Sequence, residues 1–243
     1  VVITPPTFGF YKVAARIQGA GVLEVPLVRD DFHLDAGKVI AAGLRAKIVF
    51  LCSPNNPTGN LLDEVAMLRV CTELAGKALV VVDEAYVEFC GRASLTARLA
   101  EFPNLVILRT LSKAYALAGA RLGTVIASEE IIGLLRRIIP PYAIPASTAV
   151  DVLALTEAPQ RALSAARIRT LLDERSRMQE RLGRCANVAR VFPSDANFLL
   201  VECRNARQFL AAGKSAGLIV RDFSSYAGLA NCLRISIGTP DQN

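Results

Sequence analysis

Short apolar segments alternate with amphipathic helical segments along the first half of this chain, and this alternation restricts the possible folds more than any other feature. The apolar runs KIVFLCS (47–53), ALVVVDEAY (78–86) and NLVILRT (104–110) have the length of strands, while DEVAMLRVCTELA (63–75) has helical spacing. Strands that read as continuous hydrophobic runs are buried on both faces, which is typical of parallel sheets covered by helices. The sequence therefore predicts an α/β fold, with a three-layer α/β/α domain built on a mostly parallel sheet.

The second half of the chain has a different pattern. Prolines interrupt the alternation at IIPPYAIPAS (138–147), and a long helical stretch follows from about Ser147 to Arg184, with a bend expected near Pro159. Four short strands are predicted at VARVF, ANFLLVE, GLIVRD and CLRISIG, with a helix between Ala206 and Ala216. We interpret this half as a smaller α+β domain, and we predict a large domain over 1–146 and a small domain over 147–243.

Composition and charge exclude several classes of protein. The chain has 243 residues, of which 52% are apolar, enough to bury a core. No run reaches the roughly 18 apolar residues that a membrane span needs, and the start of the chain lacks the pattern of a signal peptide, so we expect a soluble cytoplasmic protein. The net charge is +6, but the basic residues are scattered, so no nucleic-acid partner is predicted. His33 is the only histidine, and the six cysteines form no CxxC pair, which argues against a metal site or a Ser-His-Asp triad.

Polar clusters end three of the predicted strands, at SPNNPTG (53–59), Asp83 to Tyr86, and Thr110 to Lys113, and Arg121 follows one short helical stretch later. Ligands of open α/β sheets bind beyond the carboxyl ends of the strands. A lysine in weakly polar surroundings can form a Schiff base with a carbonyl compound. A phosphorylated aldehyde cofactor would also use small hydroxyl groups and Arg121 at a helix N-terminus.

An aspartate at the end of a buried strand could hold the protonated ring nitrogen of pyridoxal phosphate. Each residue alone has a simpler interpretation: Asp83 could cap a helix, Lys113 could be a surface lysine, and NNPTG could be a plain turn. Their order at the ends of successive strands favours a common site.

The same segments carry a resemblance to a known family. The chain resembles the fold-type I pyridoxal-phosphate aminotransferases, and most closely the branch that acts on histidinol phosphate. The likeness spans nearly the whole sequence, through PPTFGFYKVAARIQGAGVLEVPL, DDFHLD, CSPNNPTGN, VVVDEAYVEF, RTLSKAYALAGARLG and LRISIGTPDQN. Relatives also have a segment before the first of these motifs, with an arm and a glycine-containing turn, so we expect this chain to lack part of the large domain and the end of the small one.

The resemblance implies a role for each of ten residues. Lys113 would carry pyridoxal phosphate as a Schiff base and move the substrate proton, and Asp83 would pair with the ring nitrogen. The remaining implied contacts are hydrogen bonds to the ring oxygen (Asn56, Tyr86), phosphate ligands (Thr110, Ser112, Arg121), a ring stacked on the cofactor (Phe8), and ligands of the substrate (Arg221, Arg234, Asn56). No metal is implied.

The function that the resemblance implies is amino-group exchange between L-histidinol phosphate and 2-oxoglutarate, with glutamate as the other product, by a homodimer. Three alternatives stay open from the sequence. Two share the chemistry and the fold: an aromatic-amino-acid aminotransferase, and a decarboxylase of a phosphorylated amino acid. The third is an aminotransferase-like sensor module of a transcription regulator.

Overall fold

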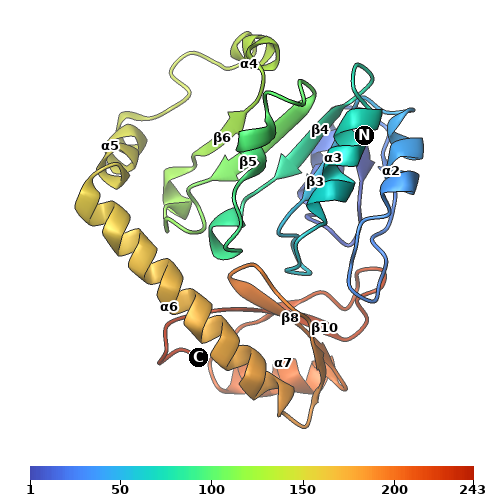
Figure 1. Ribbon diagram of the computed structural model, residues 1–243. Coiled ribbons are helices and arrows are strands. Elements are labelled where there is room, and N and C mark those ends of the chain that lie inside the picture. Colours follow the sequence, from blue (N-terminus) through green and yellow to red (C-terminus); the bar gives the residue numbers. More distant parts are fainter.

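The computed structural model describes residues 1–243 and contains two β-sheets (Figure 1). The larger sheet has six strands in the order β2-β1-β3-β4-β5-β6. These strands are β1 (Val2–Ile3), β2 (Leu23–Glu24), β3 (Ile48–Cys52), β4 (Leu79–Asp83), β5 (Leu105–Thr110) and β6 (Gly123–Ile126). All neighbours pair in parallel except β5 and β6, which are antiparallel. The prediction of an α/β fold with a mostly parallel sheet is therefore confirmed.

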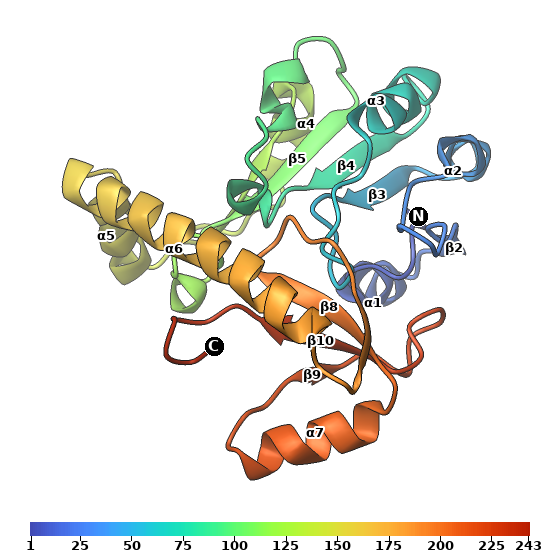
Figure 2. The ribbon, with the colours of Figure 1, turned by 60° about the horizontal axis from the view of Figure 1, so that its bottom comes forward.

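Helices cover both faces of the larger sheet. They are α1 (Phe10–Ile17), α2 (Ala36–Gly43) and α3 (Glu64–Glu73), whereas α4 (Glu129–Arg136), which follows β6, has no buried residue. Side chains alternate between the two faces of a strand, so the neighbours of β3 show which helix lies on which face. Leu51 packs in one buried cluster with residues of α2 and α3, whereas Phe50 and Cys52 pack with Tyr11 of α1 in another. Helix α1 therefore lies on the opposite face from α2 and α3 (Figure 2).

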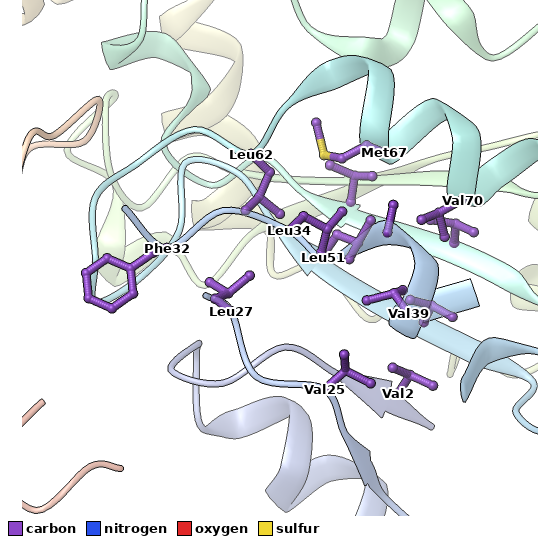
Figure 3. Close-up of a cluster of buried hydrophobic side chains, with 14 of the residues drawn as sticks. Val2, Val25, Leu27, Phe32, Leu34, Val39, Leu51, Leu62, Met67 and Val70 are labelled. Carbon is purple, nitrogen blue, oxygen red and sulfur yellow. The ribbon is translucent and has the colours of Figure 1, made fainter. Parts of the chain in front are cut away.

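The main core lies between the sheet and the pair α2 and α3. Figure 3 shows Val39 of α2, Met67 and Val70 of α3, and Leu51 of β3 within this cluster. The two helices begin at side-chain caps, because the carboxylate of Asp35 accepts a hydrogen bond from the backbone N–H of Lys38, and Asp63 does the same for Ala66. Such caps satisfy N–H groups that have no partner within the helix.

Short 3-10 helices, not α-helices, occupy the connections on either side of β5. They are η1 (Val87–Phe89), η2 (Leu95–Arg98) and η3 (Ala118–Ala120). The first two lie between β4 and β5, and the third lies between β5 and β6. Residues 111–122 connect β5 to the antiparallel β6 and contain no α-helix.

The smaller sheet is antiparallel, with the order β7-β8-β10-β9. Its strands are β7 (Val188–Val191), β8 (Phe198–Cys203), β9 (Arg221–Asp222) and β10 (Cys232–Ser236), and α7 (Ala206–Ser215) lies between β8 and β9. These elements confirm the four strands and the helix predicted for the second half of the chain.

The long helix predicted to bend near Pro159 is two helices. Helix α5 (Ala146–Leu155) and helix α6 (Ala158–Gly183) are separated by Thr156 and Glu157. Pro159 lies in the first turn of α6, where its missing N–H costs nothing. Its ring is incompatible with a preceding helical turn, so the helix breaks there and the predicted continuity was wrong. Helix α6 then runs to the smaller sheet (Figure 1).

The two sheets share buried residues. Leu200 of β8, together with Phe192 and Phe223, belongs to the same cluster as the core residues of the larger sheet. The rings of Phe32 and Phe192 lie 5.2 Å apart and join the two parts directly. The boundary at 146/147 stays a prediction. None of the helices is both long enough and apolar enough to cross a lipid bilayer.

Candidate active site

A cavity of about 520 Å³ lies at the carboxyl ends of β3 and β4, between the larger sheet and the smaller one. Its walls contain both aromatic and charged side chains. The lining residues are Thr7, Phe8, Gly9, Phe10, Val13, Cys52, Asn56, Asp83, Ala85, Tyr86, Lys113, Arg221, Phe223, Tyr226 and Arg234. Seven of the ten residues that the sequence nominated are therefore brought to one cavity, from segments far apart in the chain.

Asp83 is the last residue of β4 and lies beside Cys52, the last residue of β3. Its Oδ2 accepts a hydrogen bond from the hydroxyl of Tyr11 at 2.5 Å, and its Oδ1 accepts one from the backbone N–H of Ala85 at 3.0 Å. Burial raises the pKa of Asp83, and these two donors, together with the charge of Lys113, oppose that rise. The result is a fixed carboxylate at the end of a central strand.

Lys113 follows β5 and is exposed to the cavity. Its Nζ lies 5.6 Å from the centre of the Tyr86 ring. Loss of water around the amine lowers the pKa of Lys113, and the positive charges of Arg234 and Arg121 lower it further, against the opposite effect of Asp83. A lower pKa increases the fraction of neutral amine, which is the form that attacks a carbonyl.

Tyr86 is buried, with its ring packed edge-on against Phe198 at 5.2 Å between centroids. Burial raises the pKa of Tyr86 to about 12, and the charge of Arg234 acts in the opposite direction. The phenol therefore stays protonated near neutral pH and can donate a hydrogen bond into the cavity.

Arg234 reaches the cavity from β10. Its Nη1 donates a hydrogen bond of 2.7 Å to Oδ1 of Asn56, and its guanidinium lies 4.9 Å from the centre of the Phe198 ring. The Nε atom of Arg234 is buried without a hydrogen-bond partner. Arg221 of β9 pairs directly with Arg234 in the antiparallel register, so both side chains are on one face of the smaller sheet. Two cationic side chains thus line one end of the cavity.

Thr110, Ser112 and Arg121 are not among the residues that line the cavity. The hydroxyl of Thr110 accepts a hydrogen bond from the backbone N–H of Ser112 at 3.1 Å, and Arg121 donates to the carbonyl oxygen of Ala118 at 2.8 Å. The α-helix N-terminus expected here is absent, since the segment between β5 and β6 contains only the 3-10 helix η3. Their role as phosphate ligands stays a prediction.

Sequence reasoning missed several residues of the cavity, notably Tyr11 beside it and Tyr226, Phe223 and Cys52 in its wall. Cys52 could have been found, since it ends the strand directly before SPNNPTG. Tyr11 lies within the motif that carries the resemblance, but nothing local pairs it with a residue 72 positions away. No sequence pattern around Tyr226 indicates that it lines the cavity.

The whole chain, residues 1–243, matches the family model for aminotransferases of class I and II. It is 46% identical to histidinol-phosphate aminotransferase of Xanthomonas campestris pv. campestris, in an alignment that covers 100% of this chain and 68% of that protein.

Two solved structures extend the comparison. The histidinol-phosphate aminotransferase of Clostridium acetobutylicum superposes with a TM-score of 0.90 at 23% identity, over 99% of this chain and 73% of that one. The enzyme of the same name from Sinorhizobium meliloti, in complex with pyridoxal-5'-phosphate, has a TM-score of 0.86 at 26% identity, over 99% of this chain and 66% of that one. The chain belongs to the class I and II aminotransferase family.

Proposed function

We propose that this chain is a pyridoxal-phosphate-dependent aminotransferase that exchanges an amino group between L-histidinol phosphate and 2-oxoglutarate. The observation that carries the proposal is the convergence of Lys113, Asp83 and the paired Arg221 and Arg234 on one cavity. The substrate rests on the relatives, which are histidinol-phosphate aminotransferases at 46% identity. Small-molecule substrates are consistent with a cavity of about 520 Å³.

The residues present fit pyridoxal phosphate. The cavity offers aromatic walls for a planar ring, an amine for its aldehyde and a carboxylate for its ring nitrogen. Phe8 would stack on the ring, and Asn56 and Tyr86 would hydrogen-bond its oxygen. Thr110 ends β5, Ser112 adjoins Lys113 in the chain, and Arg121 follows η3; these three would hold the phosphate group.

Pyridoxal phosphate supplies, when bound, an aldehyde for covalent attachment and an electron sink for the substrate α-carbon. Lys113 contributes an amine whose pKa is lowered by partial loss of water and by nearby positive charge, so that more of it is neutral. In the neutral form its Nζ can accept the proton from the substrate α-carbon and later return it. Asp83 contributes a negative charge that is fixed before the substrate arrives, which avoids the cost of reorganising solvent.

Arg221 and Arg234 would bind the anionic group of the substrate. Guanidinium groups form strong paired hydrogen bonds with phosphate and carboxylate oxygens. Two of them at one end of the cavity suit a dianionic phosphate, whereas a single one would suffice for a carboxylate. The Asn56 contact already fixes Arg234 in the cavity.

A cytoplasmic homodimer is part of the proposal. Large apolar side chains are exposed on the segment that joins the larger sheet to α6, and a second subunit would cover them. They are Leu134, Ile138, Ile139, Tyr142, Ile144, Val150 and Leu153.

Two measurements on the cofactor-loaded protein test this function. Borohydride reduction followed by peptide mass mapping should place a phosphopyridoxyl group on Lys113. Transamination of 2-oxoglutarate should then proceed far better with histidinol phosphate than with phenylalanine or tyrosine. Label on another lysine would overturn the site, and equal turnover of the aromatic amino acids would overturn the substrate.

A further inference from the structure

Tyr11 lies just behind the cavity. It is in α1, where its side chain and that of Ala15 are buried one helical turn apart. Its ring stacks on Phe50 of β3, with 4.7 Å between centroids and an interplanar angle of 6°. The stacking partner and the buried helix face fix the plane of the ring, so the hydroxyl group has one direction in which to point.

That direction leads to Asp83. The hydroxyl of Tyr11 donates to Oδ2 at 2.5 Å, while the backbone N–H of Ala85 donates to Oδ1 at 3.0 Å. An ionised carboxylate has about four acceptor positions. One donor on each oxygen therefore fixes the rotation of the carboxylate and leaves acceptor positions free for a ligand in the cavity.

The other titratable groups around Asp83 come from the elements on each side of it. They are Cys52 on β3, Tyr86 after β4, Lys113 after β5 and Tyr11 on α1. Burial raises the pKa of both Tyr11 and Cys52, so both stay neutral and Tyr11 remains a donor. Only Lys113 and Tyr11, among these side chains, stabilise the ionised form of Asp83.

We propose that Tyr11 is a positioning residue, which orients the Asp83 carboxylate toward the cavity and keeps it ionised there. The proposal rests on the proposed function, in which Asp83 holds the protonated ring nitrogen of the cofactor. A purely structural Tyr11 would fill space against Phe50 and would affect stability alone. The two roles differ in what happens to the cofactor when only the hydroxyl group is removed.

The test is Tyr11→Phe in the cofactor-loaded protein, since phenylalanine keeps the ring stacking and removes the donor. A positive charge at the ring nitrogen lowers the pKa of the nitrogen that links the cofactor to lysine, because the two charges repel. Without Tyr11, Asp83 becomes more basic and takes a larger share of the ring proton. The pH titration of the cofactor's visible absorbance should therefore shift upward by roughly one unit, and kcat should fall roughly tenfold.

Two further variants make the result decisive. In an Asp83→Asn background, Tyr11→Phe should cause little additional shift, because the hydroxyl acts through the carboxylate. Tyr115→Phe removes a hydroxyl from a partly buried tyrosine outside the cavity, and its titration should match that of the unmodified protein. An unchanged titration in Tyr11→Phe, or an equal shift in the Asp83→Asn background, would overturn the proposal.

Borohydride labelling separates this inference from the function on which it rests. Label on Lys113 in both the unmodified protein and Tyr11→Phe, with the shifted titration, supports the inference. Label on Lys113 without the shift overturns the role of Tyr11 and leaves the proposed function standing. Label elsewhere in the unmodified protein overturns the proposed function itself.

Discussion

The guanidinium of Arg234 donates a 2.7 Å hydrogen bond to the side-chain oxygen of Asn56, across 178 positions of the sequence. Arg234 belongs to the smaller sheet, and Asn56 follows a strand of the larger one. This bond joins the two sheets at the wall of the cavity, so it ties their relative placement to the shape of the site.

The first prediction concerns the anion ligand. Arg234→Gln should raise the KM for histidinol phosphate about ten- to a hundredfold, since a hydrogen bond to a charged group contributes roughly 1.5–3 kcal/mol. The penalty should shrink for histidinol, which lacks the phosphate. Arg184→Gln is the matched control, because Arg184 is an exposed arginine that pairs with Glu180 on α6. Equal losses for both substrates would show that Arg234 does not bind the phosphate.

The second prediction concerns the pH dependence of cofactor binding. The pKa of Lys113 is lowered, so its neutral form persists at lower pH than for a free lysine side chain, whose pKa is about 10.4. The rate of covalent attachment should therefore reach half its maximum below that pH. Arg234→Gln removes one of the charges that lower the pKa, so it should move the midpoint upward. Stopped-flow absorbance, after mixing the cofactor with cofactor-free protein, measures the pH midpoint of attachment for the unmodified protein and for Arg234→Gln. A midpoint of the unmodified protein at the free-lysine value would contradict the prediction.

The third prediction is that replacing Asp83 lowers activity without lowering the stability of the fold. Asp83→Asn keeps the shape but loses the charge, and kcat should fall by about two orders of magnitude or more. The pKa of Asp83 is raised in the folded state, which therefore binds the proton more tightly than the unfolded chain. Burying the ionised form thus costs stability at pH above the folded pKa, and the cost disappears as the pH falls below the unfolded value of about 3.9.

The corresponding measurement is urea unfolding of the cofactor-free protein. Asp83→Asn should be at least as stable as the unmodified protein at pH 7, and its advantage should shrink as the pH is lowered toward the unfolded value of about 3.9. A large loss of stability at pH 7 would indicate that the hydrogen bonds from Tyr11 and Ala85 outweigh the cost of burial.

The fourth prediction concerns the core that the two sheets share. Leu200→Ala should lower the free energy of unfolding by about 2–5 kcal/mol, because Leu200 is fully buried in that cluster. Val65→Ala is the control, since Val65 is 75% exposed and its loss should cost no more than about 0.5 kcal/mol. Equal effects of the two substitutions in denaturant unfolding would show that the sheets do not depend on this cluster.

Much of the fold could be predicted because its signals are local. Runs such as ALVVVDEAY identify a buried strand and the polar residues that end it, and parallel pairing then brings the ends of β3, β4 and β5 to one edge. That reasoning placed Asp83, Tyr86, Asn56 and Lys113 together, and all four line the cavity. The same kind of local signal located the interruption near Pro159, but it predicted a bend in one helix where the structure has two helices.

Contacts between distant segments depended on the tertiary structure. The hydrogen bond from Tyr11 to Asp83 exists because α1 packs on the face of β3 opposite to α2, and no pattern within α1 specifies that partner. Between β5 and antiparallel β6 the chain forms only the 3-10 helix η3, so the α-helix N-terminus expected at Arg121 is absent. The sequence by itself determined which residues are apolar, which end strands and which carry charge. The packing of the two sheets decided which of those charges meet, since burial and pairing energies arise only between surfaces in contact.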